Sequence, residues 1–528
     1  MKAYDPHDAT TRPSRSDTGE ELRVAITFNR PGQDFGPTRF GARMSTDTVS
    51  SFIPDPAQAD LALAELARRG FTLTGRGSLS ASMRCTREQF EALFQTKLKR
   101  MKAPCASAAQ FGSVLYPPDN APWNPDPAIQ SLLDDVYIQW PHIYMAKAAR
   151  AAKAAKAAKS TKARKTSSTA AKKRATPKPQ EAGAPSATPP NVPYFHLAAP
   201  ADIALKLNAT PVHQQGITGK GVRIAMIDSG FAHSHPYFKA HGYASSIVLA
   251  PGATDRRTDG SGHGTGESAN IFAIAPGATF IGVKLDNEAD PSSGASVLEG
   301  LQEALKHDPQ VISVSLGYDL RGPGDTPLKT LPNGLVALEA EIQAAVKRGI
   351  VIVFSAGNGH YSFPGQMPEI ISAGGVFVDQ NGAMRASDYA SAFTSLIYSG
   401  RSVPDVCGLV GLLPHATYIS LPVWPGCEID RENAAFDGTT PTDGWGVFSG
   451  TSAAAPQLAG LCALLLQADP HLSPSDIKAI LRRTARDVTK GHANPASDPK
   501  GVGVPAGVGE DGATGAGLVD ALAAVKQV

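Results

Sequence analysis

The chain has 528 residues, little cysteine and no long hydrophobic run. Its five cysteines are odd in number and match no metal-ligand spacing, which disfavours both a disulfide framework and a zinc site. We predict that Cys407 and Cys427 are ordinary thiols, and their pairing in an oxidising compartment is the alternative. No run of 18 apolar residues occurs, which argues against a membrane span.

The N-terminus also lacks the apolar stretch of a standard secretory signal. Residues 1–21 read MKAYDPHDATTRPSRSDTGEE and are predicted to be disordered. Cytoplasmic residence is therefore the default expectation, and secretion by a non-standard route is the alternative. The formal net charge of +2 points to no particular partner.

Acidic residues are missing from most of a low-complexity segment at residues 146–191. Twelve Lys or Arg residues lie between Lys147 and Lys178 with no acid among them. Such a composition cannot form a core, so we expect a solvated basic linker. Binding of nucleic acid or another polyanion is the alternative, and it is disfavoured because no stacking aromatic residues are interleaved with the charge.

Before this linker, residues 22–145 have the pattern of a small α+β domain. Strands are predicted at 22–28, 71–75, 78–85 and 136–140, and a helix at 56–69. Thr86 and Gln89 form a capping box for a second helix that carries Phe90, Leu93 and Phe94 on one face. The order β-α-β-β-α-β suggests a ferredoxin-like fold.

After the linker, residues 192–528 alternate apolar strands with helices. GVRIAMID, ATFIGVKL, VISVSLG and GIVIVFSAG are nearly continuous hydrophobic runs, as expected of parallel strands covered on both faces. The segments between them, such as SVLEGLQEALKH, have helical periodicity. We therefore predict an α/β fold with a mostly parallel sheet and helices on both faces.

Three short stretches in this region carry catalytic side-chain types beside glycine. They are IAMIDSG around Asp228, GSGHGTGES around His263 and FSGTSAAAP around Ser452. A nucleophilic hydroxyl needs a base to take its proton, and that base needs a carboxylate to hold its tautomer. Each stretch alone has a structural interpretation, such as a turn-forming aspartate, but together they predict a catalytic triad. Thr265 or a neighbour is expected to cap the helix that starts near His263.

A fourth stretch, Ser-Ala-Gly-Asn-Gly, follows the strand IVIVF and places Asn358 at a strand end. An asparagine there can simply organise a turn. Beside a serine nucleophile, however, its side-chain amide can donate a hydrogen bond to the oxyanion of a tetrahedral intermediate.

These stretches resemble the motifs of the subtilase (subtilisin-like, S8) family of serine peptidases over roughly residues 192–528. GITGKGVRIAMIDSG is similar to the family's Asp motif, SGHGTG to its His motif, SAGNG to its oxyanion motif and SGTSAAAP to its Ser motif. The resemblance implies that Ser452 is the nucleophile, His263 the general base and then acid, and Asp228 its orienting carboxylate. Asn358 and the Ser452 N–H would be the oxyanion donors. Glu267 is expected to act only indirectly.

The resemblance also implies a substrate site. Ser315, Leu316 and Gly317 match the strand that binds the substrate backbone, with Ser293 and Gly294 on the opposite side and residues 354–357 along the specificity pocket. Main-chain recognition predicts broad specificity for protein or peptide substrates. Uncharged side chains are the expected preference, because no acid is evident at the base of the pocket.

Two departures from the family pattern concern metal binding and an insertion. No cofactor is expected, and the segment after His263 lacks the Asn-containing loop that binds calcium in many relatives, which argues against a structural calcium ion here. Residues 407–445 show little periodicity and are expected to form an irregular rim or lid over the cleft.

Subtilases are commonly made with an N-terminal prodomain, and residues 22–145 resemble one. This implies an intramolecular inhibitor and folding assistant, released by self-cleavage between about residues 145 and 195. An unrelated appended domain is the alternative. For the whole protein the alternatives are a catalytically inactive protein and a polyanion-bound regulator that uses the basic linker. The presence of Asp228, His263, Asn358 and Ser452 argues against the former.

Overall fold

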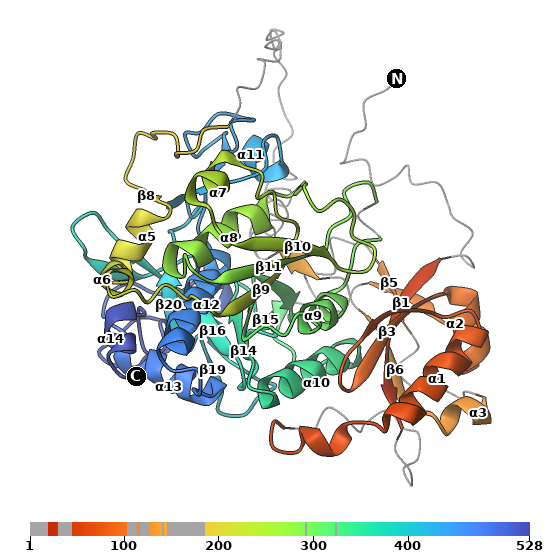
Figure 1. Cartoon of the computed structure of the whole chain (residues 1–528). Coiled ribbons are helices and arrows are strands. Elements are labelled where there is room, and N and C mark those ends of the chain that lie inside the picture. The colour runs from red at the N-terminus through yellow and green to blue at the C-terminus, as the bar shows by residue number, and fades with distance from the viewer. Residues whose placement is uncertain are drawn as a thin grey trace, which may run out of the picture.

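The computed structural model describes residues 20–29, 45–102, 113–116, 126–139, 142–144, 185–290, 293–322 and 325–528 (Figure 1). Residues 1–19, Cys105 and the predicted linker as far as residue 184 lie outside the described residues. The first strand begins at Glu21, one residue inside the segment predicted to be disordered.

The N-terminal part of the chain contains an antiparallel four-stranded sheet in the order β2-β3-β1-β6. One helix follows β1 and another follows β3, as the sequence pattern suggested. The elements of this N-terminal unit are β1 (Glu21–Phe28), η2 (Val49–Phe52), α1 (Pro56–Arg68), β2 (Thr72–Arg76), β3 (Ser80–Thr86), α2 (Arg87–Phe94), β4 (Lys99–Lys102), β5 (Ser113–Tyr116), α3 (Pro127–Gln130) and β6 (Leu133–Ile138).

Local sequence signals explain where the two main helices of this unit begin. The Asp55 carboxylate accepts the N–H of Ala57 at the start of α1. At the start of α2, Thr86 and Gln89 form the predicted capping box in both directions. The predicted apolar face of α2 is buried, and the rings of Phe90 and Phe94 have centroids 4.8 Å apart.

The last strand of this unit was predicted three residues too late. β6 spans Leu133–Ile138 and begins before the predicted range of 136–140. Its first half contains Asp134 and Asp135, which are almost fully buried although they are acidic. Thr27 on β1 donates its hydroxyl to Asp134 at 3.4 Å. The Asp135 carboxylate accepts the N–H of the adjacent Val136 at 2.7 Å. These hydrogen bonds allow the two carboxyls to be buried, and hydropathy alone cannot show them.

The C-terminal part of the chain is built around an eight-stranded sheet that is parallel except for one edge pair. Seven strands follow the order β10-β11-β9-β12-β14-β16-β17, and β20 pairs with β16. Their bounds are β9 (Arg223–Asp228), β10 (Ser245–Leu249), β11 (Thr279–Lys284), β12 (Val311–Val314), β14 (Val351–Ser355), β16 (Ile371–Val378), β17 (Met384–Ala386) and β20 (Val406–Leu409).

Helices cover both faces of this sheet, so its strands are hydrophobic on both sides. Along β9, Ile224 and Met226 belong to the core shared with α8 (His263–Ile274) and α12 (Thr451–Ala468). The alternate residues Ala225 and Ile227 belong to the core shared with α9 (Val297–Leu305) and α10 (Asn333–Lys347). This alternation confirms the predicted α/β arrangement.

Shorter elements surround the sheet and complete the described part of the chain. They are β7 (Ile143–Tyr144), β8 (Leu197–Ala198), α5 (Ala201–Lys206), α6 (Thr210–Gln214), α7 (Pro236–His241), β13 (Leu316–Asp319), β15 (Ser362–Phe363), β18 (Phe393–Thr394), β19 (Ser402–Val403), α13 (Pro474–Thr484), η6 (Pro495–Ser497) and α14 (Ala521–Val525).

α12 is the one described helix whose length and hydropathy would also suit a membrane span. Within the fold, 89% of that stretch is buried between the sheet and α8. Core helices of this kind pass the same composition test, so the finding does not indicate a membrane segment.

The segment at residues 407–445 is more regular than predicted. It contributes most of β20 to the main sheet. It also contains β21 (Ile419–Pro422), which pairs with β22 (Trp445–Val447) and β8. Helix α11 (Glu428–Asn433) lies between them. Backbone N–H groups of Glu428 and Ile429 donate to the carbonyls of Gly260 and Ser261, just before His263. The segment thus supports the histidine loop from its side, and its role as a rim or lid over the cleft stays a prediction.

The described cysteines are all free thiols, as predicted for Cys407 and Cys427. Cys85, Cys407, Cys427 and Cys462 are buried and unpaired with one another. Burial raises the pKa of each of these thiols, which keeps them protonated and poorly reactive.

Candidate active site

Asp228 is the last residue of β9 and lies at the carboxyl edge of the parallel sheet, where ligands of such folds bind. Its side chain is fully buried. One carboxylate oxygen, Oδ1, accepts the N–H of Ser229 and the Nδ1–H of His263, both at 2.7 Å. The contact fixes the tautomer of the imidazole and leaves Nε2 as its basic nitrogen.

His263 is the first residue of α8, and the cap of this helix differs from the prediction. Gly262 is the N-cap, with φ of 83°, and makes no side-chain capping bond. Thr265 lies within the helix, where its hydroxyl donates to Asp259 and accepts the N–H of Ala232. Thr265 therefore ties the helix start to the loop after β9 instead of capping it.

Asp259 holds this loop together, and sequence analysis did not identify it. Its carboxylate accepts hydrogen bonds from Ser229 Oγ at 2.9 Å, Gly262 N at 2.9 Å and Thr265 N at 2.9 Å. An aspartate four residues before the motif histidine was the available signal, but turn-forming aspartates are common. Asp259 is fully buried and links the Asp228 and His263 segments.

Glycine at position 264 allows those two segments to approach closely. A Cβ at this position would lie 2.4 Å from the Gly230 carbonyl oxygen and 2.9 Å from the Asp228 Cβ. Any larger residue would therefore push α8 away from β9 and lengthen the contact between His263 and Asp228.

Ser452 is the second residue of α12, at the N-terminal end where the helix dipole favours negative charge. It is almost fully buried, and its Oγ lies 3.4 Å from the Ser315 carbonyl oxygen. In return, Ser315 Oγ donates to the Ser452 carbonyl at 2.8 Å. These contacts attach the start of α12 to the segment between β12 and β13.

Asn358 follows β14 and lies against the start of α12. Its Oδ1 accepts the N–H and the hydroxyl of Thr451, each at 3.0 Å. Its Nδ2 is buried and meets no hydrogen-bond acceptor among the described residues. A Cβ on Gly450 would lie 2.6 Å from this nitrogen. Asn358 therefore presents a free amide donor beside Ser452.

Electrostatics at the histidine are dominated by burial and by carboxylates. Burial by itself lowers the pKa of His263, but Asp228, followed by Glu267 and Asp259, outweighs this effect and raises it. The imidazole is thus a stronger base than an isolated histidine. This arrangement can accept a proton from a neighbouring hydroxyl and stabilise the resulting imidazolium.

The predicted substrate strand lies next to this centre and is already paired with another strand. Leu316 and Gly317 belong to β13, which pairs antiparallel with β15 on one side and with β7 on the other. In the latter pair, Leu316 faces Tyr144 and Gly317 faces Ile143. An extended segment from before the linker therefore runs along the strand predicted to hold the substrate.

Gly294 lies in the loop between β11 and α9. A Cβ there would come within 2.8 Å of the Leu285 carbonyl oxygen, so close packing accounts for the glycine. The carbonyl of the neighbouring Ser293 accepts a hydrogen bond from Arg84 of the N-terminal unit at 3.2 Å. A role of Gly294 in substrate binding stays a prediction.

Metal-binding chemistry is not evident in the described ranges. Among those residues, no three His, Cys, Asp or Glu side chains gather in a way that suits a metal ion.

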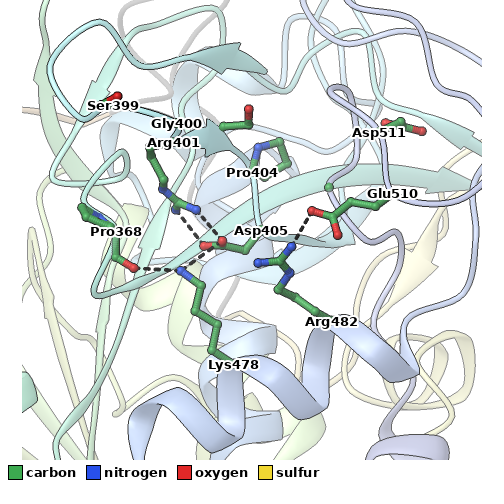
Figure 2. Close-up of a pocket in the computed structure, with 12 residues that line it drawn as sticks. Pro368, Ser399, Gly400, Arg401, Pro404, Asp405, Lys478, Arg482, Glu510 and Asp511 are labelled. Carbon is green, nitrogen blue, oxygen red and sulfur yellow. Dashed lines mark hydrogen bonds and ion pairs between the residues drawn. The ribbon is translucent and has the colours of Figure 1, made fainter.

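A separate cavity of about 430 Å³ is lined by several charged residues and by none of the four candidate catalytic residues (Figure 2). Asp405 forms ion pairs there with Arg401 and Lys478, and the Lys478 ammonium also donates to the carbonyls of Pro368 at 3.0 Å and Ile370 at 2.8 Å. Arg482 pairs with Glu510 at the more exposed side. The basic groups are matched by acidic ones, so the cavity is a structural charge cluster.

Sequence comparisons find bacterial subtilisins as relatives of this chain. It is 28% identical over 296 residues to subtilisin E of Bacillus subtilis and to a subtilisin of Bacillus pumilus, and 26% identical over 292 residues to subtilisin Savinase of Lederbergia lenta. Each match covers 53% of this chain. The matches span 64% of the length of subtilisin E and 89% of the other two relatives.

Comparison with solved structures and with family models agrees with this relationship. Fervidolysin from Fervidobacterium pennivorans, a keratinolytic enzyme related to subtilisin, matches with a TM-score of 0.51 at 17% identity, over 97% of this chain and 62% of that one. This likeness supports the subtilisin-like fold. The model of the subtilase family, peptidase family S8, matches residues 219–504, more than half of the chain, and the protein therefore belongs to the subtilase family.

Proposed function

We propose that the protein is a serine endopeptidase that hydrolyses peptide bonds through an acyl-enzyme intermediate. The observation that carries the proposal is the bond of 2.7 Å between His263 Nδ1 and Asp228 Oδ1, at the sheet edge that also holds Ser452 and the free amide of Asn358. The family relationship supports the same activity.

In the first half of the reaction, Ser452 Oγ attacks the carbonyl carbon of the scissile peptide bond while His263 Nε2 takes its proton. Asp228 keeps the proton on Nδ1 and stabilises the imidazolium that forms. When the tetrahedral intermediate collapses, the C–N bond breaks and His263 gives its proton to the leaving amine. The acyl group remains esterified to Ser452.

In the second half, a water molecule attacks the ester carbonyl and His263 takes one of its protons. The C–O bond to Ser452 then breaks, and the serine oxygen recovers the proton. In both halves the carbonyl oxygen becomes negatively charged. Asn358 Nδ2 and the Ser452 N–H are the proposed donors to this oxyanion, and the N-terminal end of α12 adds favourable potential.

We also assign substrate binding to β13, with the peptide in an extended conformation. The pairing of β7 with β13 supports this, because it shows that β13 accepts an antiparallel segment through its backbone. Recognition through the main chain implies broad specificity, and an uncharged side chain remains the expected preference.

The same pairing supports a self-processing zymogen, in which the N-terminal unit inhibits the enzyme until it is cut away. With β7 on β13, a peptide substrate cannot pair there. The N-terminal sheet also packs against α9 and α10 (Figure 1), whose core includes Leu316 and Tyr318 of β13. The cleavage expected between about residues 145 and 195 would separate β7 from the peptidase unit.

Specific contacts fasten the N-terminal unit to these two helices. The buried carboxylate of Glu341 on α10 accepts the N–H groups of Ser78, Leu79 and Ser80 at 2.7–2.9 Å, and the Ser80 hydroxyl at 2.8 Å. On α9, Glu299 accepts the Thr74 hydroxyl at 2.6 Å. The carboxylates of Glu341 and Glu299 are fully buried and need hydrogen-bond donors, so these contacts favour this docking.

Labelling with a fluorophosphonate, which forms a stable adduct with an activated serine, tests the activity. The wild type and the exposed-site control Ser475→Ala should be labelled, and Ser452→Ala should not be. The measurement is made on full-length protein and on protein cut in the linker by an added protease. If neither form shows labelling that depends on Ser452, the protein is not a serine peptidase.

The second candidate function, a polyanion-bound regulator, rests on the basic residues of the linker. Binding of a peptide of residues 146–190 to DNA, with an affinity that falls steeply with salt, would favour it. A plain spacer predicts no measurable binding at physiological salt.

A further inference from the structure

A carboxyl group other than Asp228 lies at the catalytic histidine. Glu267 is four residues after His263 on α8, so both side chains lie on the same side of the helix. Its Oε1 is 3.9 Å from His263 Nε2, whereas Asp228 contacts the other ring nitrogen, Nδ1. Glu267 and His263 are each 1% exposed. No hydrogen-bond partner among the described residues reaches Glu267 Oε1.

The other oxygen of Glu267 is held by a chain of buried amides. Asn270 Nδ2 donates to Glu267 Oε2 at 3.0 Å, and Asn270 Oδ1 accepts from Gln457 Nε2 at 2.9 Å. Gln457 Oε1 in turn accepts the N–H of Leu409 on β20 at 2.7 Å. Gln457 belongs to α12, five residues after Ser452. The row of bonds therefore connects the helix of the histidine with the helix of the serine.

The hydrogen bonds through Asn270 and Gln457 orient Glu267 toward His263. Asn270 and Gln457 are fully buried, and each uses its amide oxygen and nitrogen in the row, which fixes which atom faces which neighbour. Oε2 is thereby committed to Asn270, and Oε1 is left on the side of His263 Nε2. Packing alone does not explain a carboxyl group here, because burying an apolar side chain at this position would cost less free energy of desolvation.

We propose that Glu267 is a positioning residue for catalysis, a second carboxyl partner of His263 that favours the protonated imidazole. The inference rests on the proposed peptidase function only for its consequence on activity. An imidazolium next to two carboxylates is more stable than one next to Asp228 alone, so His263 holds its proton to higher pH. The acid limb of the activity profile should then lie at higher pH than the pKa of an ordinary histidine would place it.

The other ionisable groups around the pair are few among the described residues. Asp228 on β9 and Asp259 in the preceding loop act on His263, and His142 from the segment before β7 interacts with Asp228. Burial raises the pKa of Glu267, while the charge of His263 opposes that rise. Because the charges of the two groups interact, they titrate as a pair. When the pair holds a single proton, we propose that the proton is on the imidazole of His263 and that Glu267 is a carboxylate.

The decisive measurement is an NMR titration of the His263 ring in full-length Ser452→Ala protein, which does not depend on activity. Adding Glu267→Gln keeps the size and an acceptor for Asn270 but removes the charge. It should lower the pKa of His263 by about one unit, a tenfold change in its proton affinity. Glu339→Gln, at a buried carboxyl that bonds Tyr398 instead, is the matched control and should leave it unchanged.

Glu267→Leu gives a second variant in case the amide perturbs folding, and it should produce the same downward shift. On the Ser452-containing enzyme, Glu267→Gln should move the acid limb of kcat/KM to lower pH by a similar amount. An unchanged His263 pKa in both variants would overturn the inference, even if activity fell uniformly at every pH. Absence of activity in the wild type would instead count against the proposed function, since the titration is read independently.

Discussion

At the scale of single residues, the site depends on small side chains as much as on reactive ones. Gly264 allows Asp228 and His263 to meet, and Gly450 leaves room for the amide of Asn358. The four residues predicted to be catalytic come from separate parts of the chain, at the end of β9, after β14 and at the starts of two helices. His263 contacts Asp228, and Asn358 contacts Thr451 beside Ser452, whereas Ser452 Oγ donates to the Ser315 carbonyl. Their roles in the reaction stay predictions that mutagenesis can test.

Asn358→Ala should lower kcat by about 100- to 1,000-fold and leave KM nearly unchanged, because the lost donor acts on charge that exists only in the transition state. Steady-state kinetics with a peptide substrate measures both constants, and the melting temperature checks that the lost bonds to Thr451 have not unfolded the protein. A higher KM at unchanged kcat would mean that Asn358 binds substrate and does not stabilise the oxyanion.

At the residue scale, the sequence could suggest candidate residues only where the signal is local. The motifs around Asp228, His263 and Ser452 were evident because glycine and a reactive residue stand side by side. Asp259 was missed because its partners, Ser229 and Thr265, are assembled only when two loops meet. The capping role predicted for Thr265 failed for the same reason, since its hydroxyl finds a tertiary partner.

At the scale of elements, α13 is fastened to the sheet by charge as well as by apolar packing. Its Lys478 side chain reaches Asp405, which is 2% exposed and precedes β20 (Figure 2). Burial by itself would raise the pKa of Asp405, but Lys478 and Arg401 outweigh it and hold the pKa below its ordinary value. Burial lowers the pKa of Lys478 to about 8, so the pair remains charged at neutral pH.

Lys478→Met should destabilise the fold by about 3 kcal/mol at pH 7, because a buried carboxylate loses one of its cations. The stabilisation from a lowered carboxyl pKa is present above the unfolded value of about 3.9 and is lost as pH falls through the folded value. The difference from the parent protein should therefore shrink in strong acid. Denaturation of Ser452→Ala proteins, which avoids self-digestion, measures it.

Arg482→Met is the matched control in the same cavity. Its ion pair with Glu510 is 40% and 58% exposed, so its loss should change stability by about 1 kcal/mol or less. Equal effects of the two substitutions at pH 7 would contradict the role assigned to the buried pair.

Element boundaries followed from local signals in many places. The capping box of α2 and the apolar runs of β9, β11, β12 and β14 were predicted close to where they lie. β6 and the segment at 407–445 were not, because their order comes from cross-strand and loop contacts. The buried Asp134 and Asp135 interrupt the apolar pattern of β6, so its start was not evident from the sequence. The segment at 407–445 is ordered by the pairing of β21 with β8 and β22.

At the scale of the whole molecule, the N-terminal unit and the C-terminal part of the chain share an interface that ends at the candidate active site. The N-terminal sheet rests on α9 and α10 (Figure 1), and the chain then returns as β7, which pairs with β13. Substrate access, folding and release of the N-terminal unit are therefore expected to depend on one another.

Self-processing is tested by following purified protein on a gel. The wild type should split into an N-terminal and a C-terminal fragment, and Ser452→Ala should stay intact. If the wild type keeps its full length while fully active and Ser452→Ala behaves identically, self-processing is wrong.

Glu341→Ala should weaken the interface, because three backbone N–H groups and a hydroxyl lose their acceptor. After cleavage, its two fragments should separate on size-exclusion chromatography under conditions where the wild-type fragments elute together. Lys306→Ala, a change at an exposed side chain just after α9, is the control and should behave as the wild type.

The sequence by itself determined the residue types of the reaction and the class of fold. The residue types and the fold class both follow from local sequence, since a short motif specifies its own turn and an apolar run specifies its own strand. Tertiary structure decided what the residues face. The spacing of four residues on α8 places Glu267 and His263 on one side of the helix, but the bond from Gln457 to Asn270, which holds the other oxygen of Glu267, joins positions 187 residues apart. Hydrogen bonds between distant segments depend on packing geometry, which no local pattern encodes.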